Sequence, residues 1–214
     1  MDWDSLEKHF SSARLGRYLA SCNGDKPRAA RAYVNNLLLA EAMMPMLNVL
    51  EIALKNGIHS RLTSFYKRGD WWQAWTNVPT FDWQMREIGS AKAKLQRRAE
   101  AATVDKIVAE LAFGFWSSLF NVHFQTLLWK ELRLVFPRCP KSHRQRQTVS
   151  AALNKVRSLR NRVFHHEQLL WLDPSLYEMH AKGIEVVGWL DPQLQMWLAQ
   201  HDRLPAVWRA VQPI

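Results

Sequence analysis

Apolar residues recur at helical spacing along most of the chain, and turn signals divide them into segments. The first segment runs from Trp3 to about Cys22 and stops at the turn sequence CNGD. Pro27 suits the first turn of a second helix, PRAARAYVNNLLLAEAM. Pro45 should kink or restart that helix, because proline removes a hydrogen bond from a helix interior. The following segment, PMLNVLEIALKNGIHSRLTSFY, carries one apolar stripe: Leu47, Leu50, Leu54, Ile58 and Leu62.

The second half continues in the same way. KRGDWWQAWTNVPTFDW predicts a loop, followed by a helix that ends near Glu100. Further helices are expected over 104–111 and, after a bend at FGFW, over 120–136. PRCPKSHR predicts a loop, helical spacing resumes near Gln145, and shorter helices follow DPSL and DPQL. The pattern predicts an all-α protein with a single domain over 1–214, because no repeat or shift in composition divides it.

Composition agrees with a helical class. Hydrophobic residues make up 48% of the 214 residues, and eight Gly and nine Pro are too few turn formers for an all-β sandwich or barrel. No apolar run is expected to reach the ~18 residues of a membrane span. The N-terminus MDWDSLEKHF lacks the basic start and apolar centre of a signal peptide, so we expect a cytoplasmic protein. Cys22 and Cys139 fit neither a disulfide framework nor a zinc site, which predicts two free thiols.

Positive charge is concentrated in one segment. The formal net charge is +10, and the segment from Lys130 to Arg162 alone carries ten basic residues against one acid, Glu131. Such a segment attracts polyanions and favours a nucleic-acid partner. The expected RNA contacts are Arg138, Lys141, Arg144, Arg146 and Arg157. A solvated helix face that only keeps the protein soluble is the alternative.

The stretch LRNRVFHHEQLLW, which begins at Leu159, places charged and polar residues within an otherwise apolar run. If 153–170 is one helix, its apolar stripe of six positions includes Arg160 and Glu167. A buried charge without a partner is strongly unfavourable. Arg160 should therefore pair with an acid, face a cleft or lie at a subunit interface.

Groups suited to phosphate chemistry gather beside Arg160. Asn161 and His165 share a helix face with Arg157, and Arg162 precedes His165 by three positions and His166 by four. Arginine holds phosphate oxygens, and histidine moves protons near neutral pH. Residues five apart on an ideal helix point about 140° away from each other. Arg160 and His165 therefore converge only through a helix break near Phe164, the reach of arginine or a second subunit.

RNRVFHH resembles the R-N-x-x-x-H signature of HEPN domains, with Arg160, Asn161 and His165 at the matching places. The chain is also similar to the Abi-like (abortive infection) branch of that superfamily, because SSARLGRYLASC, LNVLEIALKNGIHSRL leading to GDWW, AELAFGFW and LRNRVFHHE occur in the expected order. This resemblance extends from Ser11 to about Leu172. We place the motif core at about 28–172, with extra N-terminal helices and a C-terminal helical extension over 173–214.

The resemblance implies a HEPN-like helical bundle that forms a homodimer in which two motifs face each other. It also implies an endoribonuclease that needs no metal or cofactor and acts in phage defence or as a toxin, with an antitoxin or other regulatory partner. Arg160 would stabilise the phosphoryl group, His165 would act as acid or base or orient the phosphate, and Asn161 would position both. The alternatives are a catalytically inactive HEPN module that binds RNA or a protein, and a purely structural dimerisation domain.

Four further residues are candidates for supporting roles. His166 is a second proton carrier or, equally, a surface or capping histidine. Glu51, with Asn48 and Lys55 on the same helix face, is placed to pair with Arg160 across the bundle; ordinary surface polarity is the alternative. Arg162 belongs to the basic group around His165. No metal site is expected, since the chain has neither HExxH nor a His and Cys set with ligand spacing.

Overall fold

The computed structural model describes residues 2–211, and within that range all regular structure is helical. The predicted all-α class is therefore confirmed. The α-helices are α1 (Trp3–Phe10), α2 (Ser12–Ser21), α3 (Lys26–Tyr66), α4 (Asp82–Arg97), α5 (Val104–Glu110), α6 (Phe113–Ser118), α7 (Gln125–Leu132), α8 (Arg146–Phe164), α9 (Leu176–Leu190), α10 (Pro192–Ala199) and α11 (Leu204–Val211). Short 3-10 helices are η1 (Trp71–Trp75), η2 (Pro79–Phe81), η3 (Val122–Phe124) and η4 (Arg133–Val135).

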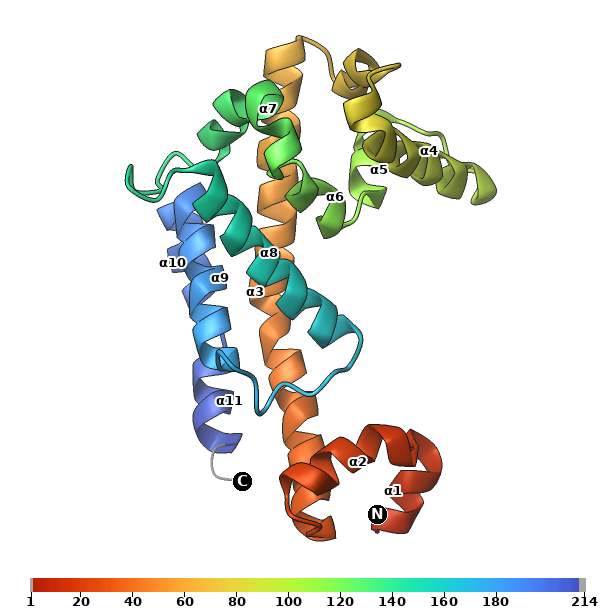
Figure 1. Ribbon diagram of the computed structural model, residues 1–214, viewed down its shortest axis with the longest axis vertical. Helices are drawn as coiled ribbons and strands as arrows, with labels where there is room; N and C mark the ends of the chain where they lie inside the picture. The colour runs from red at the N-terminus through yellow and green to blue at the C-terminus, as the bar shows by residue number, and fades with distance from the viewer. Residues whose placement is uncertain (1, 212–214) are drawn as a thin grey trace.

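Helix α3 is the axis around which the others are arranged (Figure 1). Its N-cap is Asp25, whose side chain accepts a hydrogen bond from the backbone N–H of Arg28, and its C-cap is Lys67, in a left-handed conformation with φ 55°. Of the kink or restart predicted at Pro45, the restart is wrong, because α3 runs through this residue as one helix. Buried residues continue on both sides of Pro45, and this packing holds the helix together where one backbone hydrogen bond is missing.

Helix α3 also contains an 18-residue window that is apolar enough to cross a membrane by length and composition alone. The expectation that no segment reaches this length is therefore wrong. A single helix of this kind is weak evidence for a membrane span, because core helices of soluble proteins meet the same criteria; 39% of the window is buried inside the structure. The large apolar side chains of α3 that remain exposed are Val34, Leu37, Leu38, Met44, Ile52 and Phe65.

Two hydrophobic clusters make up the interior. The main core extends from Leu39 on α3 through the later helices to Val211 on α11. It includes the tryptophans of the predicted loop, because η1 buries Trp71, Trp72 and Trp75. A separate N-terminal cluster joins α1 and α2 to the start of α3 and consists of Trp3, Leu15, Tyr18, Cys22, Ala29, Ala32 and Tyr33.

The single helix predicted over 120–136 is wrong. The segment forms η3, α7 and η4, which turn the chain back on itself. The rings of Phe120 and Phe136 consequently lie 5.6 Å apart between centroids, edge to face. One straight helix would separate these residues by about 24 Å, at 1.5 Å per residue. The chain bends because both rings must be buried in the same core.

Candidate functional site

The end of α8 determines where the motif side chains lie. The helix predicted over 153–170 is wrong at its end, because α8 stops at Phe164. His166 has φ 55°, and its backbone N–H bonds to the carbonyl of Val163 at 3.1 Å while that of Glu167 bonds to Arg162 at 2.8 Å. These two bonds form a Schellman motif, in which the left-handed position is commonly glycine. Glu167 and the residues after it therefore leave the helical stripe.

Arg160 lies between α8 and α3. Its Nε is 3.5 Å from Glu51 Oε2, and its guanidinium carbon is 4.4 Å from the centroid of the Phe164 ring. The two charged side chains are 28% and 25% exposed. The pair has ion-pair distance but not the geometry of a hydrogen bond, since the buried Nε donates to no residue of 2–211. Glu51 thus lies beside Arg160, as the helix-face argument predicts.

His165 faces the N-terminal helices instead. It is exposed and lines a cavity of about 540 Å³ together with His166, Arg14, Arg17 and Tyr18. Arg14 Nη1 donates a hydrogen bond of 2.8 Å to the carbonyl oxygen of His166, which joins α2 to the end of α8. Burial raises the pKa of Tyr18 to about 12, so this phenol remains protonated at neutral pH.

The sequence analysis did not assign Arg14 or Arg17 to the site. Both lie in SSARLGRYLASC, and their spacing of three places them on one face of α2. That spacing was an available signal. Their position beside His165 could not be predicted from the sequence, because it depends on how α2 packs against the turn after α8.

The remaining motif residues are distributed around these two groups. Arg160 does not line the His165 cavity. Asn161 is exposed, and its side chain has no hydrogen-bond partner among residues 2–211. Arg162 Nη1 donates to Glu167 Oε2 at 3.2 Å. Asn48 lines a different cavity, between α3 and α10, and the structure does not bring it to Arg160.

Two of the arginines predicted to contact RNA are engaged within the protein. Arg144 donates to the carbonyl oxygens of Pro137 and Cys139, and Arg146 donates to the Phe120 carbonyl and to Gln125 Oε1. These bonds fix the loop that leads into α8. Contacts of Arg138, Lys141, Arg144, Arg146 and Arg157 with RNA stay a prediction.

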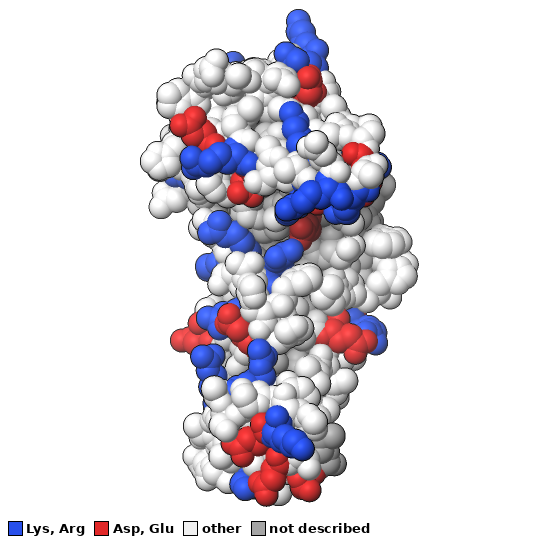
Figure 2. Space-filling view, turned by 90° about the vertical axis from the view of Figure 1, so that its right-hand side faces the viewer, with Lys and Arg blue, Asp and Glu red and all other residues white. Residues whose placement is uncertain are grey.

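The surface charge is mixed on the face shown in Figure 2. Lysine and arginine are interspersed with acidic groups there and form no continuous field of one sign.

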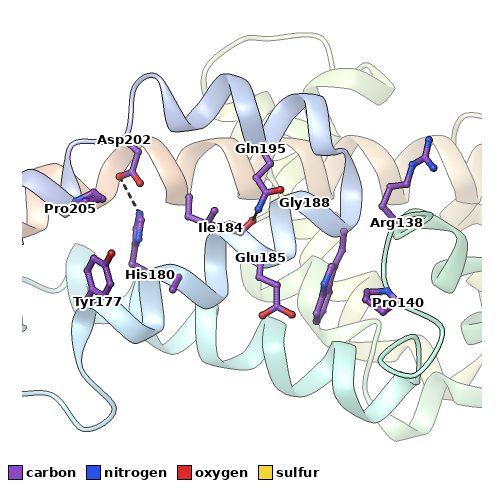
Figure 3. A pocket seen from close by; sticks show the side chains of 12 residues that line it. Arg138, Pro140, Tyr177, His180, Ile184, Glu185, Gly188, Gln195, Asp202 and Pro205 are labelled. Atoms are coloured by element: carbon purple, nitrogen blue, oxygen red, sulfur yellow. Dashed lines mark hydrogen bonds and ion pairs between the residues drawn. The ribbon is translucent and has the colours of Figure 1, made fainter.

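A second cavity, of about 520 Å³, lies among the C-terminal helices (Figure 3). His180 Nε2 is 3.1 Å from Asp202 Oδ1, which links α9 to the segment before α11. Burial lowers the pKa of His180, and the nearby carboxylate of Asp202 opposes that shift. Gln195 Nε2 donates to the Ile184 carbonyl, so α10 is held against α9. These polar groups join helices of the C-terminal extension.

Both cysteines are buried free thiols, as predicted. Among residues 2–211, no three His, Cys, Asp or Glu side chains are grouped so that they would hold a metal ion. No protein-family model, curated protein or solved structure matches the chain. The resemblance to HEPN domains therefore depends on the sequence motifs alone.

Proposed function

We propose that the chain is a metal-independent endoribonuclease of the Abi-like HEPN type. The observation that carries this proposal is the environment of His165, an exposed imidazole in an open cavity beside Arg14 and Arg17. Arginine is the side chain best suited to hold phosphate oxygens, and histidine transfers protons near neutral pH. The cavity thus combines an anion-binding wall with an acid or base.

The proposed reaction uses the ribose 2′-hydroxyl as the nucleophile. A base removes its proton while the 2′-oxygen bonds to the adjacent phosphorus, and the bond to the 5′-oxygen breaks as that oxygen receives a proton. The products are a 2′,3′-cyclic phosphate and a 5′-hydroxyl. His165 transfers or orients a proton, arginine stabilises the crowded anionic phosphoryl group, and Asn161 positions the other two.

A homodimer would bring the separated parts of the motif together. In one protomer Arg160 lies against α3 whereas His165 lies against α2. Phe164, whose ring contacts the Arg160 guanidinium, is 44% exposed, and Ile52, which follows Glu51 on α3, is 43% exposed. Apolar groups of this kind are typical of contact surfaces when they lie side by side. We propose that this surface pairs with a second copy, so that Arg160 of one protomer acts with His165 of the other.

The biological role follows from the same motifs. Abortive infection or toxin activity, in the cytoplasm and under the control of an antitoxin or other partner, is proposed on the resemblance alone.

One observation favours a second candidate function, a catalytically inactive module that binds RNA or a protein. Arg160 is already engaged by Glu51 and Phe164. If this pair persists in the assembled protein, the guanidinium has a structural role and is not available to the phosphate.

RNA cleavage by the purified protein distinguishes the two candidates. Cleavage should persist in excess EDTA and should stop when the 2′-hydroxyl at the cut site is replaced by hydrogen. His165→Ala should lower the rate at least ~100-fold, the usual scale for a general acid or base. His201→Ala is the matched control, since that histidine is also exposed but lies after α10. No cleavage of any RNA under any condition would favour the inactive module.

The arginines of α2 provide an independent test of the same cavity. Arg14→Ala and Arg17→Ala should each lower cleavage about 10-fold, the lower end expected for loss of a hydrogen bond to a charged group. Arg97→Ala, an exposed arginine at the end of α4, is the control and should leave the rate unchanged. Equal rates for all three variants would remove α2 from the site.

A further inference from the structure

A third cavity, of about 550 Å³, lies between α4, α6, η3 and α8. It does not include His165 or Arg160, and the functional proposal above does not use it. Four of its lining side chains carry the inference: Trp83, Gln84, Ser118 and Arg157.

Gln84 places a buried amide in the wall of this cavity. The residue is 3% exposed, and its Nε2 donates to Ser118 Oγ at 3.2 Å. Ser118 Oγ in turn donates to the Phe115 carbonyl at 2.7 Å, so the hydroxyl must accept from the amide. This order fixes the orientation of Gln84 and leaves its Oε1 without a donor among residues 2–211. Buried acceptors are nearly always satisfied, so a ligand N–H is a ready explanation.

Trp83 gives the cavity an aromatic surface. It is 41% exposed, in contrast to the fully buried tryptophans of η1. Its ring stacks on Phe115, with centroids 6.3 Å apart and an angle of 27° between the planes. Phe115 is itself buried, and this contact holds the indole in place. An exposed and oriented indole is a platform on which a nucleobase can stack.

Arg157 connects the cavity to the motif on α8. It is partly buried and forms no ion pair with any residue of 2–211. It precedes Asn161 by one helical turn, so the two side chains share a face about 6 Å apart along the axis. The cavity therefore adjoins the motif, at a distance that a few nucleotides of single-stranded RNA can span. The Arg157 guanidinium is available to bind a phosphate.

We infer that this cavity binds a nucleobase of single-stranded RNA that runs along α8. Trp83 stacks on the base, Gln84 Oε1 accepts one of its N–H groups, and Arg157 holds a flanking phosphate. Base binding is independent of catalysis, whereas the further consequence, a sequence preference at the cut site, rests on the proposed function.

The direct test measures binding of adenosine 5′-monophosphate and cytidine 5′-monophosphate to the full chain by calorimetry and saturation-transfer NMR. Ribose 5-phosphate is the matched probe without a base. We expect at least one nucleotide to bind at least ~10-fold more tightly than ribose 5-phosphate, in line with the strength of base stacking on aromatic side chains. Equal binding of all three probes would overturn the inference, because it would assign the affinity to phosphate alone.

Variants then locate the base. Trp83→Ala should weaken nucleotide binding ~10-fold, and Trp83→Phe should retain most of it. Gln84→Met keeps the side-chain volume, removes the amide and should also weaken binding. Trp197→Ala is the control, since that tryptophan is 51% exposed on α10. If Trp83→Ala binds nucleotides as tightly as Trp197→Ala does, the proposed base site is refuted. Trp83→Ala should fold, because Trp83 is 41% exposed.

Sequencing of RNA cut sites separates this inference from the proposed function. If wild-type protein cleaves RNA, Trp83→Ala should lose a base preference at one position near the cut. Cleavage with an unchanged preference, together with no nucleotide binding, would overturn the base site and leave the ribonuclease intact. Nucleotide binding that depends on Trp83 in a protein that cleaves no RNA would support the base site and refute the ribonuclease.

Discussion

The main core and the N-terminal cluster differ greatly in size, although α3 runs through both. The main core buries apolar side chains from every α-helix from α3 to α11, and it also includes the aromatic rings of Trp71, Trp72 and Trp116. The N-terminal cluster consists of seven residues. Small clusters open locally at a lower free energy than a large core does. Because α2 supplies Arg14 and Arg17, the candidate site lies where the weaker region meets the stronger one.

Truncation of a tryptophan in the main core should have the largest effect. Trp116 is fully buried, and its Nε1 donates to the Leu111 carbonyl. Trp116→Ala should lower the free energy of unfolding by about 3 to 5 kcal/mol. Chemical denaturation measures this change, and Trp197→Ala, at an exposed position, should stay within about 0.5 kcal/mol of wild type. Similar losses for both variants would contradict the assignment of Trp116 to the core.

Truncation of Leu15 should destabilise the N-terminal cluster without destabilising the main core. Leu15 is fully buried in the N-terminal cluster. Leu15→Ala should cost about 2 to 4 kcal/mol, confined to α1, α2 and the start of α3. Hydrogen exchange should therefore accelerate in α2 while the amides of α9 keep their protection. Acceleration in both helices would show that the two clusters unfold as one unit.

Acidification should lower the stability of the main core before that of the N-terminal cluster. Burial lowers the pKa of His59, which accepts a hydrogen bond from Trp71 Nε1, and also lowers that of His180. In the unfolded chain histidine has a pKa of about 6.5. As the pH falls below about 6.5, the unfolded state therefore binds protons before the folded state does. The stability that these neutral histidines provide above about pH 6.5 is lost as the pH falls through their lower pKa in the folded protein.

The measurement is the free energy of unfolding at pH 7.5 and pH 5, for wild type and His180→Gln. The variant should lose less stability on acidification, and the difference should be smaller than that caused by either truncation, because Asp202 opposes the effect of burial. His201→Gln is the control. An equal pH dependence in all three proteins would exclude His180 as a source of it.

The smallest effect is expected at the turn that joins the two regions. His166 has φ 55°, a conformation that glycine adopts without strain. His166→Gly should stabilise the fold by about 0.5 kcal/mol, since relief of strain exceeds the entropy that glycine loses on folding. A thermal melt measures this shift. If cleavage also falls at least ~10-fold while stability rises, His166 has a chemical role in addition to its place in the turn.

Local sequence determined most of the helices of this protein. Apolar spacing and capping residues are properties of neighbouring positions, so the helical class and the helices after DPSL and DPQL could be predicted. The motif also follows from the sequence, since Arg160, Asn161 and His165 share one short run. The pairing of Glu51 with Arg160 could also be predicted from the sequence, because helix periodicity limits which face of α3 can meet α8.

The tertiary structure decided the continuity of α3, the bends within 120–136 and the surroundings of His165. Pro45 disfavours a continuous helix locally, but burial along the whole of α3 outweighs one lost hydrogen bond. Phe120 and Phe136 meet only because the chain between them turns back. Arg14 and Gln84 gain their positions from contacts across more than thirty residues of sequence, to His166 and Ser118. Local periodicity does not encode such contacts, because they depend on how complete helices pack.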